Sequence, residues 1–117
     1  MAEKGISLES ADVNATDANG QTALMKAAWF GQLDNAAILI DHGAQINASE
    51  NGGGTALLWA ARWGYKDTVK LLMAKGADLN AEDRTGNTAL AYASAQKHTA
   101  VVDLLGGAGL QLEIPAE

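Results

Sequence analysis

The chain has 117 residues, of which 48% are hydrophobic and 19% charged, with 14 acidic against 8 basic side chains and a formal net charge of −6. This composition is typical of one globular domain, and the acidic balance argues against nucleic acid as the main partner. The absence of cysteine excludes disulfides, thiolate metal sites and cysteine nucleophiles. Because no apolar run approaches the roughly 20 residues of a membrane span, we expect a cytoplasmic protein with no membrane partner.

The sequence repeats itself every 33 residues. Asn-Ala pairs recur at residues 14, 47 and 80, and nine of the 33 aligned columns are identical in all three copies. Such self-similarity is the signature of an array in which each unit buries its apolar face against its neighbours. We expect one domain with repeats at residues 12–44, 45–77 and 78–110, an N-terminal extension or partial cap at 1–11, and a C-terminal partial cap or tail at 111–117.

Each repeat begins with an extended piece and a polar turn. In the first repeat the turn closes at Gly20, and Thr22 follows at the position of a helix N-cap, where its hydroxyl accepts a hydrogen bond from an unpaired backbone N–H. The short helix after it has apolar side chains at i, i+3 and i+4, and Gly31 ends it as a left-handed cap. A second helix, with an apolar stripe over residues 38–40, ends at Gly43.

The third repeat departs from this pattern at the end of its first helix. Lys97 occupies the column of Gly31 and Gly64, and Ser94 replaces an alanine. A left-handed lysine costs roughly 1 kcal/mol, so we expect the turn at Lys97 to be distorted or lengthened.

The repeated unit resembles the ankyrin repeat over residues 12–110. The resemblance rests on the turn, the run G-x-T-A-L, a short helix ending in A-A-x-x-G, a second helix ending in L-L or L-I, and the closing G-A and V-N-A. It implies an all-α solenoid of three stacked helix-turn-helix repeats with short β-turn or hairpin-like connections and thin terminal caps. Alanine stands in place of the proline of the family's T-P-L-H motif, and Met25, Leu58 and Ala91 replace its histidine, whose hydrogen bonds must be weaker or absent.

Large side chains gather in the two columns before the position that ends each first helix. Neither column belongs to the apolar face of its helix, so these side chains should project away from the core. In the ankyrin family these columns and the turn tips line the concave groove where partners bind. The resemblance therefore implies a partner-binding site made of Trp29, Phe30, Arg62 and Trp63, with a polar rim of Asn19, Gln21, Arg84 and Asn87.

A competing interpretation is that these rings fold down onto neighbouring repeats and serve only as packing. Against it, Ala95 and Gln96 occupy the same columns in the third repeat, so the fold does not require aromatic side chains there. Large exposed rings are seldom left uncovered without a use. Trp59, in the middle of the second repeat's first helix, fits two descriptions equally: a half-buried packing residue or the floor of the groove.

The charge of each repeat indicates the chemistry of the partner. Four acids and one lysine give the first repeat −3, two acids and four bases give the second +2, and four acids and two bases give the third −2. An aromatic and basic centre flanked by acidic repeats favours another protein as partner. We expect an apolar segment with a nearby carboxylate, which Arg62 would bind.

The sequence offers no candidate for catalysis. His42 and His98 lie 56 residues apart in different columns without metal-ligand spacing, and we expect both at the surface. The acids Glu82 and Asp83 and the glycine-rich residues 51–54 fall in turns. We therefore predict a non-enzymatic protein-interaction module with no catalytic residue, metal or cofactor.

Two other functions stay open. The chain can act as a structural or homodimerising unit through an exposed end of the stack. That end would consist of Val101, Val102, Leu104, Leu105, Leu112 and Ile114. A small-molecule binder or an enzyme is a weaker alternative, and it requires a closed pocket with a perturbed titratable group.

Overall fold

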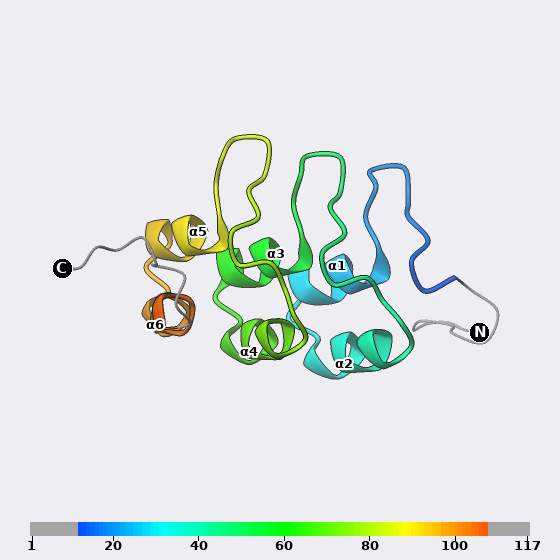
Figure 1. Ribbon diagram of the computed structural model, residues 1–117, viewed down its shortest axis with the longest axis horizontal. Helices are drawn as coiled ribbons and strands as arrows, with labels where there is room; N and C mark the ends of the chain where they lie inside the picture. Colours follow the sequence, from blue (N-terminus) through cyan, green and yellow to red (C-terminus); the bar gives the residue numbers. More distant parts are fainter. Residues whose placement is uncertain (1–11, 108–117) are drawn as a thin grey trace.

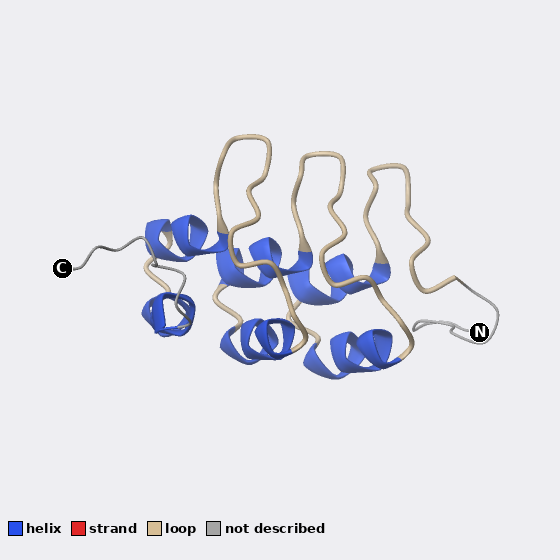
Figure 2. Cartoon of the chain, in the orientation of Figure 1, coloured by secondary structure: helices blue, strands red, loops and turns tan. Residues whose placement is uncertain are grey.

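The computed structural model describes residues 12–107, which form three helix pairs joined by long loops (Figure 1). The helices are α1 (Ala23–Trp29), α2 (Leu33–Asp41), α3 (Ala56–Trp63), α4 (Lys66–Ala74), α5 (Ala89–Ala95) and α6 (Thr99–Gly107). In this part of the chain β-type pairing is limited to one isolated bridge between Ser49 and Thr55, and Figure 2 accordingly shows helices and loops. The predicted all-helical repeat fold is confirmed. No helix among the described residues is long and apolar enough to cross a membrane.

The helices form two rows. Helices α1, α3 and α5 contact one another in one row, and α2, α4 and α6 lie beside one another in the second (Figure 1). The loops project beyond the row of α1, α3 and α5 (Figure 1). The side of α1, α3 and α5 that does not face the core is therefore bordered by the loops.

Threonine begins each first helix, as the sequence predicts. Its hydroxyl accepts a hydrogen bond from the backbone N–H three residues later, at 3.2, 3.3 and 3.1 Å in the three repeats. In the first repeat Met25 closes a reciprocal pair, because its sulfur accepts the N–H of Thr22. Each such cap stabilises its helix by about 1 kcal/mol relative to alanine. The capping residues are Thr22, Thr55 and Thr88.

The turn at Lys97 is left-handed but otherwise regular. Lys97 has φ 61°, close to the φ values of 68° at Gly31 and 77° at Gly64. Its N–H donates to a carbonyl at 3.1 Å and the next N–H donates at 2.9 Å, as the corresponding groups do after α3, at 3.1 and 3.0 Å. The expectation that this turn is distorted or lengthened is wrong. The same pair of hydrogen bonds holds Lys97 in the left-handed conformation that Gly31 and Gly64 adopt in the other repeats.

The side chain after this turn packs against the preceding repeat. A Cβ at Gly64 would lie 2.6 Å from Nδ1 of His98, and one at Gly31 would lie 2.8 Å from the ring of Tyr65. The Nε2 of His98 also hydrogen-bonds with the carbonyl oxygen of Arg62, at 2.9 Å. The expectation that His98 lies at the surface is therefore wrong, because the half-buried ring fixes the end of α3 against the next repeat.

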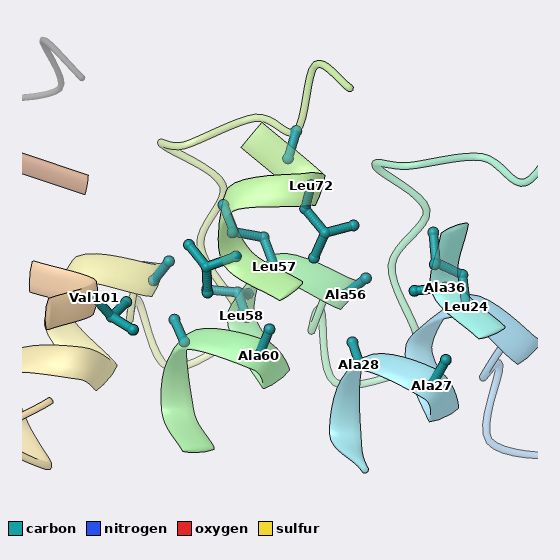
Figure 3. Packing of buried hydrophobic residues seen from close by; sticks show 14 of the residues in the cluster. Leu24, Ala27, Ala28, Ala36, Ala56, Leu57, Leu58, Ala60, Leu72 and Val101 are labelled. Carbon is teal, nitrogen blue, oxygen red and sulfur yellow. The ribbon is translucent and has the colours of Figure 1, made fainter. Parts of the chain in front are cut away.

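The core combines small and large side chains. Alanines are buried where α1, α3 and α5 approach one another, and a small side chain permits that close approach. Leucines fill the space between the two rows, and each contributes roughly 2 kcal/mol by its burial. Figure 3 shows members of both groups, including Ala27, Ala28, Ala60, Leu24, Leu57 and Leu72.

The expectation that the end of the stack exposes its apolar side chains is wrong for two of the named residues. Val101 is 1% exposed and Leu105 0%, because both side chains face inward from α6 and belong to the core. Val102 and Leu104 are partly buried against the same core. Leu112 and Ile114 lie outside the described residues.

Asparagine connects successive repeats. The Nδ2 of Asn14 donates to the carbonyl of Gly43 at 3.2 Å, and its Oδ1 accepts the N–H of Gln45 at 2.7 Å. Asn47 makes the equivalent two bonds, to the carbonyl of Gly76 at the end of its own repeat at 3.3 Å and from the N–H of Asp78 in the next repeat at 2.7 Å. These bonds give a physical reason for one of the nine identical columns.

We predict that Lys97→Gly stabilises the protein by about 0.5 to 1 kcal/mol. Glycine relieves the roughly 1 to 2 kcal/mol of left-handed strain, and part of this gain is offset by the greater freedom of glycine in the unfolded chain. Urea unfolding of both proteins measures the difference. Lys75→Gly is the matched control, because Lys75 also caps a helix but has φ −98°, and we expect it to gain nothing. A loss of stability in Lys97→Gly would contradict the prediction.

Candidate functional site

The four side chains of the predicted centre lie on the side of α1 and α3 that faces away from the core. Phe30 is 64% exposed and Trp63 is 43% exposed, while Trp29 and Arg62 are half-buried. The prediction that these columns point away from the core is therefore confirmed. We call the surface formed by Trp29, Phe30, Trp59, Arg62 and Trp63 the aromatic face.

Trp29 is the ring that packs onto the neighbouring repeat. Its ring meets that of Trp59 edge-on, with centroids 4.7 Å apart and an interplanar angle of 61°. It meets Trp63 in the same way, at 5.5 Å and 68°. The packing interpretation is thus correct for Trp29 and in part for Trp63, whose ring contacts Trp29 but stays 43% exposed, and it does not hold for Phe30, which is 64% exposed.

Arg62 lies among three rings. Its Cζ is 5.9 Å from the ring centroid of Trp59, 5.8 Å from that of Trp63 and 5.5 Å from that of Tyr92. These separations are within the range of cation–π attraction, which holds the long side chain in one place. Among residues 12–107 a single ion pair is found, between Lys26 and Asp17. No carboxylate of these residues is therefore paired with Arg62.

A pocket of about 410 Å³ opens beside Trp29. Its walls come from α1, from the first loop and from one ring of the second repeat. They are formed by Asp17, Gln21, Met25, Lys26, Trp29, Phe30 and Trp59. The sequence left open whether Trp59 is a half-buried packing residue or part of the groove floor. In the structure its ring is half-buried and also lines this pocket.

An acidic side chain ties each loop together. Asp17 Oδ1 accepts the N–H groups of Asn19 and Gln21, each at 2.9 Å. Its Oδ2 lies 3.0 Å from Nζ of Lys26, on α1. The pKa of Asp17 is lowered, chiefly by the hydrogen bond from the Gln21 N–H and then by the Lys26 ammonium. Asp17 therefore fixes the loop that forms one side of the pocket.

The second repeat lacks this connection between loop and helix. Glu50 uses its carboxylate within its own turn, where it accepts the N–H groups of Gly52 and Gly54. The opposing side chain is Trp59, whose buried Nε1 has no hydrogen-bond partner among the described residues. A Cβ at Gly54 would lie 2.7 Å from Cζ2 of Trp59, so the glycine lets the indole approach the loop closely.

The third repeat joins loop and helix by a hydrogen bond. The hydroxyl of Tyr92 donates to Oδ2 of Asp83. Burial acts to raise the pKa of Asp83, but hydrogen bonds from Tyr92, Thr85 and Asn87 outweigh it and lower the pKa to about 2. The pKa of Tyr92 is raised, first by its bond to the Asp83 carboxylate and second by burial.

The predicted rim residues have different surroundings. Gln21 lines the pocket. Asn19 and Arg84 are exposed, and their backbones join adjacent loops, because the carbonyl of Asn19 accepts from Asn51 and the N–H of Arg84 donates to Gly52. Asn87 is occupied within its own loop, where its Nδ2 donates to Oγ1 of Thr85 at 2.9 Å. The structure thus brings only Gln21 to the pocket.

Sequence reasoning missed four residues of this region. Asp17, Met25 and Lys26 line the pocket, and Tyr92 contacts Arg62. A signal was present, since Lys26, Trp59 and Tyr92 share one column, opposite the acidic column of Asp17, Glu50 and Asp83. Reading the two columns as pairs would have found the connections of the first and third repeats.

Over the described residues no group of three or more His, Asp or Glu side chains is placed to hold a metal ion. His42 is exposed, as expected, and its Nδ1 hydrogen-bonds with the carbonyl of Ile38 at 2.8 Å.

Comparison with known families gives an independent assignment. The family model described as ankyrin repeats, in three copies, matches residues 3–83 and 50–114. These two ranges overlap and together cover most of the chain. Among curated proteins, none matches the chain significantly.

We predict that Tyr92→Phe destabilises the protein by about 1 kcal/mol at pH 5 and by less near pH 2. The Asp83 pKa is depressed from 3.8 to about 2 in the folded state. Its stabilising contribution is therefore complete above pH 4 and is lost as the pH falls toward 2, and the tyrosine bond supports that contribution. Urea unfolding at pH 5, 4, 3 and 2 measures it. Tyr65→Phe is the control, and equal losses at every pH in Tyr92→Phe would contradict the prediction.

Proposed function

Because this chain belongs to the ankyrin repeat family, we propose that it is a module that binds a partner protein through the aromatic face. Ankyrin repeats are generally protein–protein interaction modules, and members of the family are typically non-enzymatic. The family supplies the class of function. The choice of surface rests on the arrangement of side chains along α1 and α3.

The observation that carries this choice is the exposure of Phe30 and Trp63. They are two of the four large apolar side chains that are exposed among the described residues, and they occupy the same repeat position at the ends of α1 and α3. Exposed apolar patches of this kind usually mark interaction sites, and tryptophan is among the commonest hot-spot residues of interfaces. Half-buried Trp29 packs against one member of the pair, since its ring meets that of Trp63 in an edge-to-face arrangement.

The charge of the aromatic face indicates what the partner carries. Arg62 lies against Trp59, Trp63 and Tyr92, and no carboxylate among residues 12–107 pairs with it. A guanidinium held in this way binds a carboxylate without losing much side-chain freedom. The proposed partner therefore presents apolar side chains with a carboxylate close by, and the acidic first and third repeats disfavour nucleic acid.

The proposal predicts that the double variant Phe30→Ala, Trp63→Ala loses partner binding but keeps its thermal unfolding midpoint within a few degrees. Both rings are exposed, so their removal leaves no cavity in the core. Affinity capture from an extract of cells that express the protein, followed by mass spectrometry, measures binding. Thermal unfolding followed by circular dichroism measures stability.

The matched control is Ile38→Ala. Ile38 is 46% exposed on α2, in the other row of helices, so its loss removes exposed apolar area away from the aromatic face. Proteins retained by the wild type and the control but lost by the double variant support the proposal. If the double variant retains the same proteins as the wild type, the aromatic face is not the binding surface.

A further inference from the structure

The pocket beside Trp29 has apolar walls and a neutralised polar edge. The rings of Trp29, Phe30 and Trp59 form most of the walls, and the largely buried Met25 contributes a smaller part. The ammonium of Lys26 and the carboxylate of Asp17, 3.0 Å apart, cancel each other's charge at the edge. A volume of about 410 Å³ lies within the range of ligand pockets and exceeds what one aromatic side chain needs. The pocket therefore favours an uncharged apolar group.

We propose that this pocket is the anchor site of the aromatic face and takes one aromatic side chain of a linear partner segment, while Arg62 binds an acidic side chain of the same segment. The inference rests on the proposed function. It adds which part of the face takes the apolar group, what that group is, and where the carboxylate lies relative to it.

The walls favour an aromatic side chain over an aliphatic one. Trp29 and Trp59 meet at 61°, and Phe30 borders the same pocket with 64% of its surface exposed. A partner ring adds edge-to-face contacts to these rings. An aliphatic side chain gains burial but lacks these edge-to-face contacts.

The distance to Arg62 sets the spacing of the motif. The ring centroids of Trp29 and Trp59 are 4.7 Å apart, and Cζ of Arg62 is 5.9 Å from the centroid of Trp59. The guanidinium therefore lies within about 11 Å of the Trp29 ring, a span that two to four residues of a bound segment cover in extended or helical form. The acidic residue of the partner lies within four residues of its aromatic anchor.

The pocket is held open without a ligand. Asp17 binds its own loop through two backbone N–H groups and reaches α1 through Lys26. Trp59 is fixed between Trp29 and the loop at Gly54. Because these contacts already order the walls, binding loses little conformational entropy, and one short segment suffices for measurable affinity.

Selection from a library of random linear peptides displayed on phage tests the proposal. The probes are the selected peptides, synthesised and titrated by calorimetry. We expect them to share an aromatic residue with Asp or Glu within four positions. Replacing the aromatic residue by alanine should weaken binding at least tenfold, and replacing the acid by its amide should weaken it about fivefold.

Variants of the protein assign these two effects to their sites. Gln21→Trp places a ring in the pocket and should weaken the same peptides at least tenfold. Ile38→Trp, the control, adds a ring to the exposed face of α2 and should leave binding unchanged. In Arg62→Gln the difference between the acid and amide peptides should disappear. Thermal unfolding checks that each variant folds.

The other outcomes separate this inference from the proposed function. One such outcome is a set of selected peptides that bind only when Phe30 and Trp63 are present and yet share no aromatic residue, or share an aliphatic residue in its place. Such peptides overturn the inference and leave the proposed function standing. If no selected peptide requires the aromatic face for binding, the inference is overturned. If the double variant Phe30→Ala, Trp63→Ala also captures the same proteins as the wild type, the proposed function is overturned as well. Dimerisation in light scattering that Phe30→Ala abolishes identifies a second copy as the occupant and overturns the inference.

Discussion

Each helix pair of this chain can bury its apolar face only against the pair beside it, and that constraint governs both the core and the candidate site. Alanines such as Ala28 and Ala60 are buried between α1, α3 and α5, so these helices approach closely. On the opposite side of the same helices, the close approach brings Trp29 within reach of Trp59 and Trp63. Because small side chains in the core let the helices approach closely, large side chains from different repeats can contact one another and form one surface.

The repeats share one scaffold but join loop and helix by different chemistry. An ion pair connects them in the first repeat and a hydrogen bond from tyrosine to aspartate in the third. In the second repeat the carboxylate of Glu50 is used within its own turn, and Trp59 packs closely against Gly54. The candidate site therefore lies where the second repeat has a tryptophan ring in place of the polar contact that joins loop and helix in the other two repeats.

Much of the fold was predictable because its signals are local. A threonine hydroxyl reaches the N–H three residues later wherever a helix begins, so Thr22 was recognisable as a cap without its surroundings. Lys97 shows the limit of such reasoning. Its left-handed conformation followed from its column, but its regular turn depends on hydrogen bonds that the whole repeat imposes. The burial of Val101 and Leu105 was missed because it depends on how α6 is rotated toward the core.

The sequence by itself determined the 33-residue period, the helix caps, the direction in which Phe30 and Trp63 point, and the positive charge of the central repeat. Each of these follows from residue type and spacing along one helix or turn. Only the tertiary structure decided that Trp29 packs on the next repeat, that Arg62 lies among three rings, and that Trp59 closes a pocket with the first loop. These contacts join residues of different repeats, and their geometry depends on the distance and rotation between helices, which no single repeat contains.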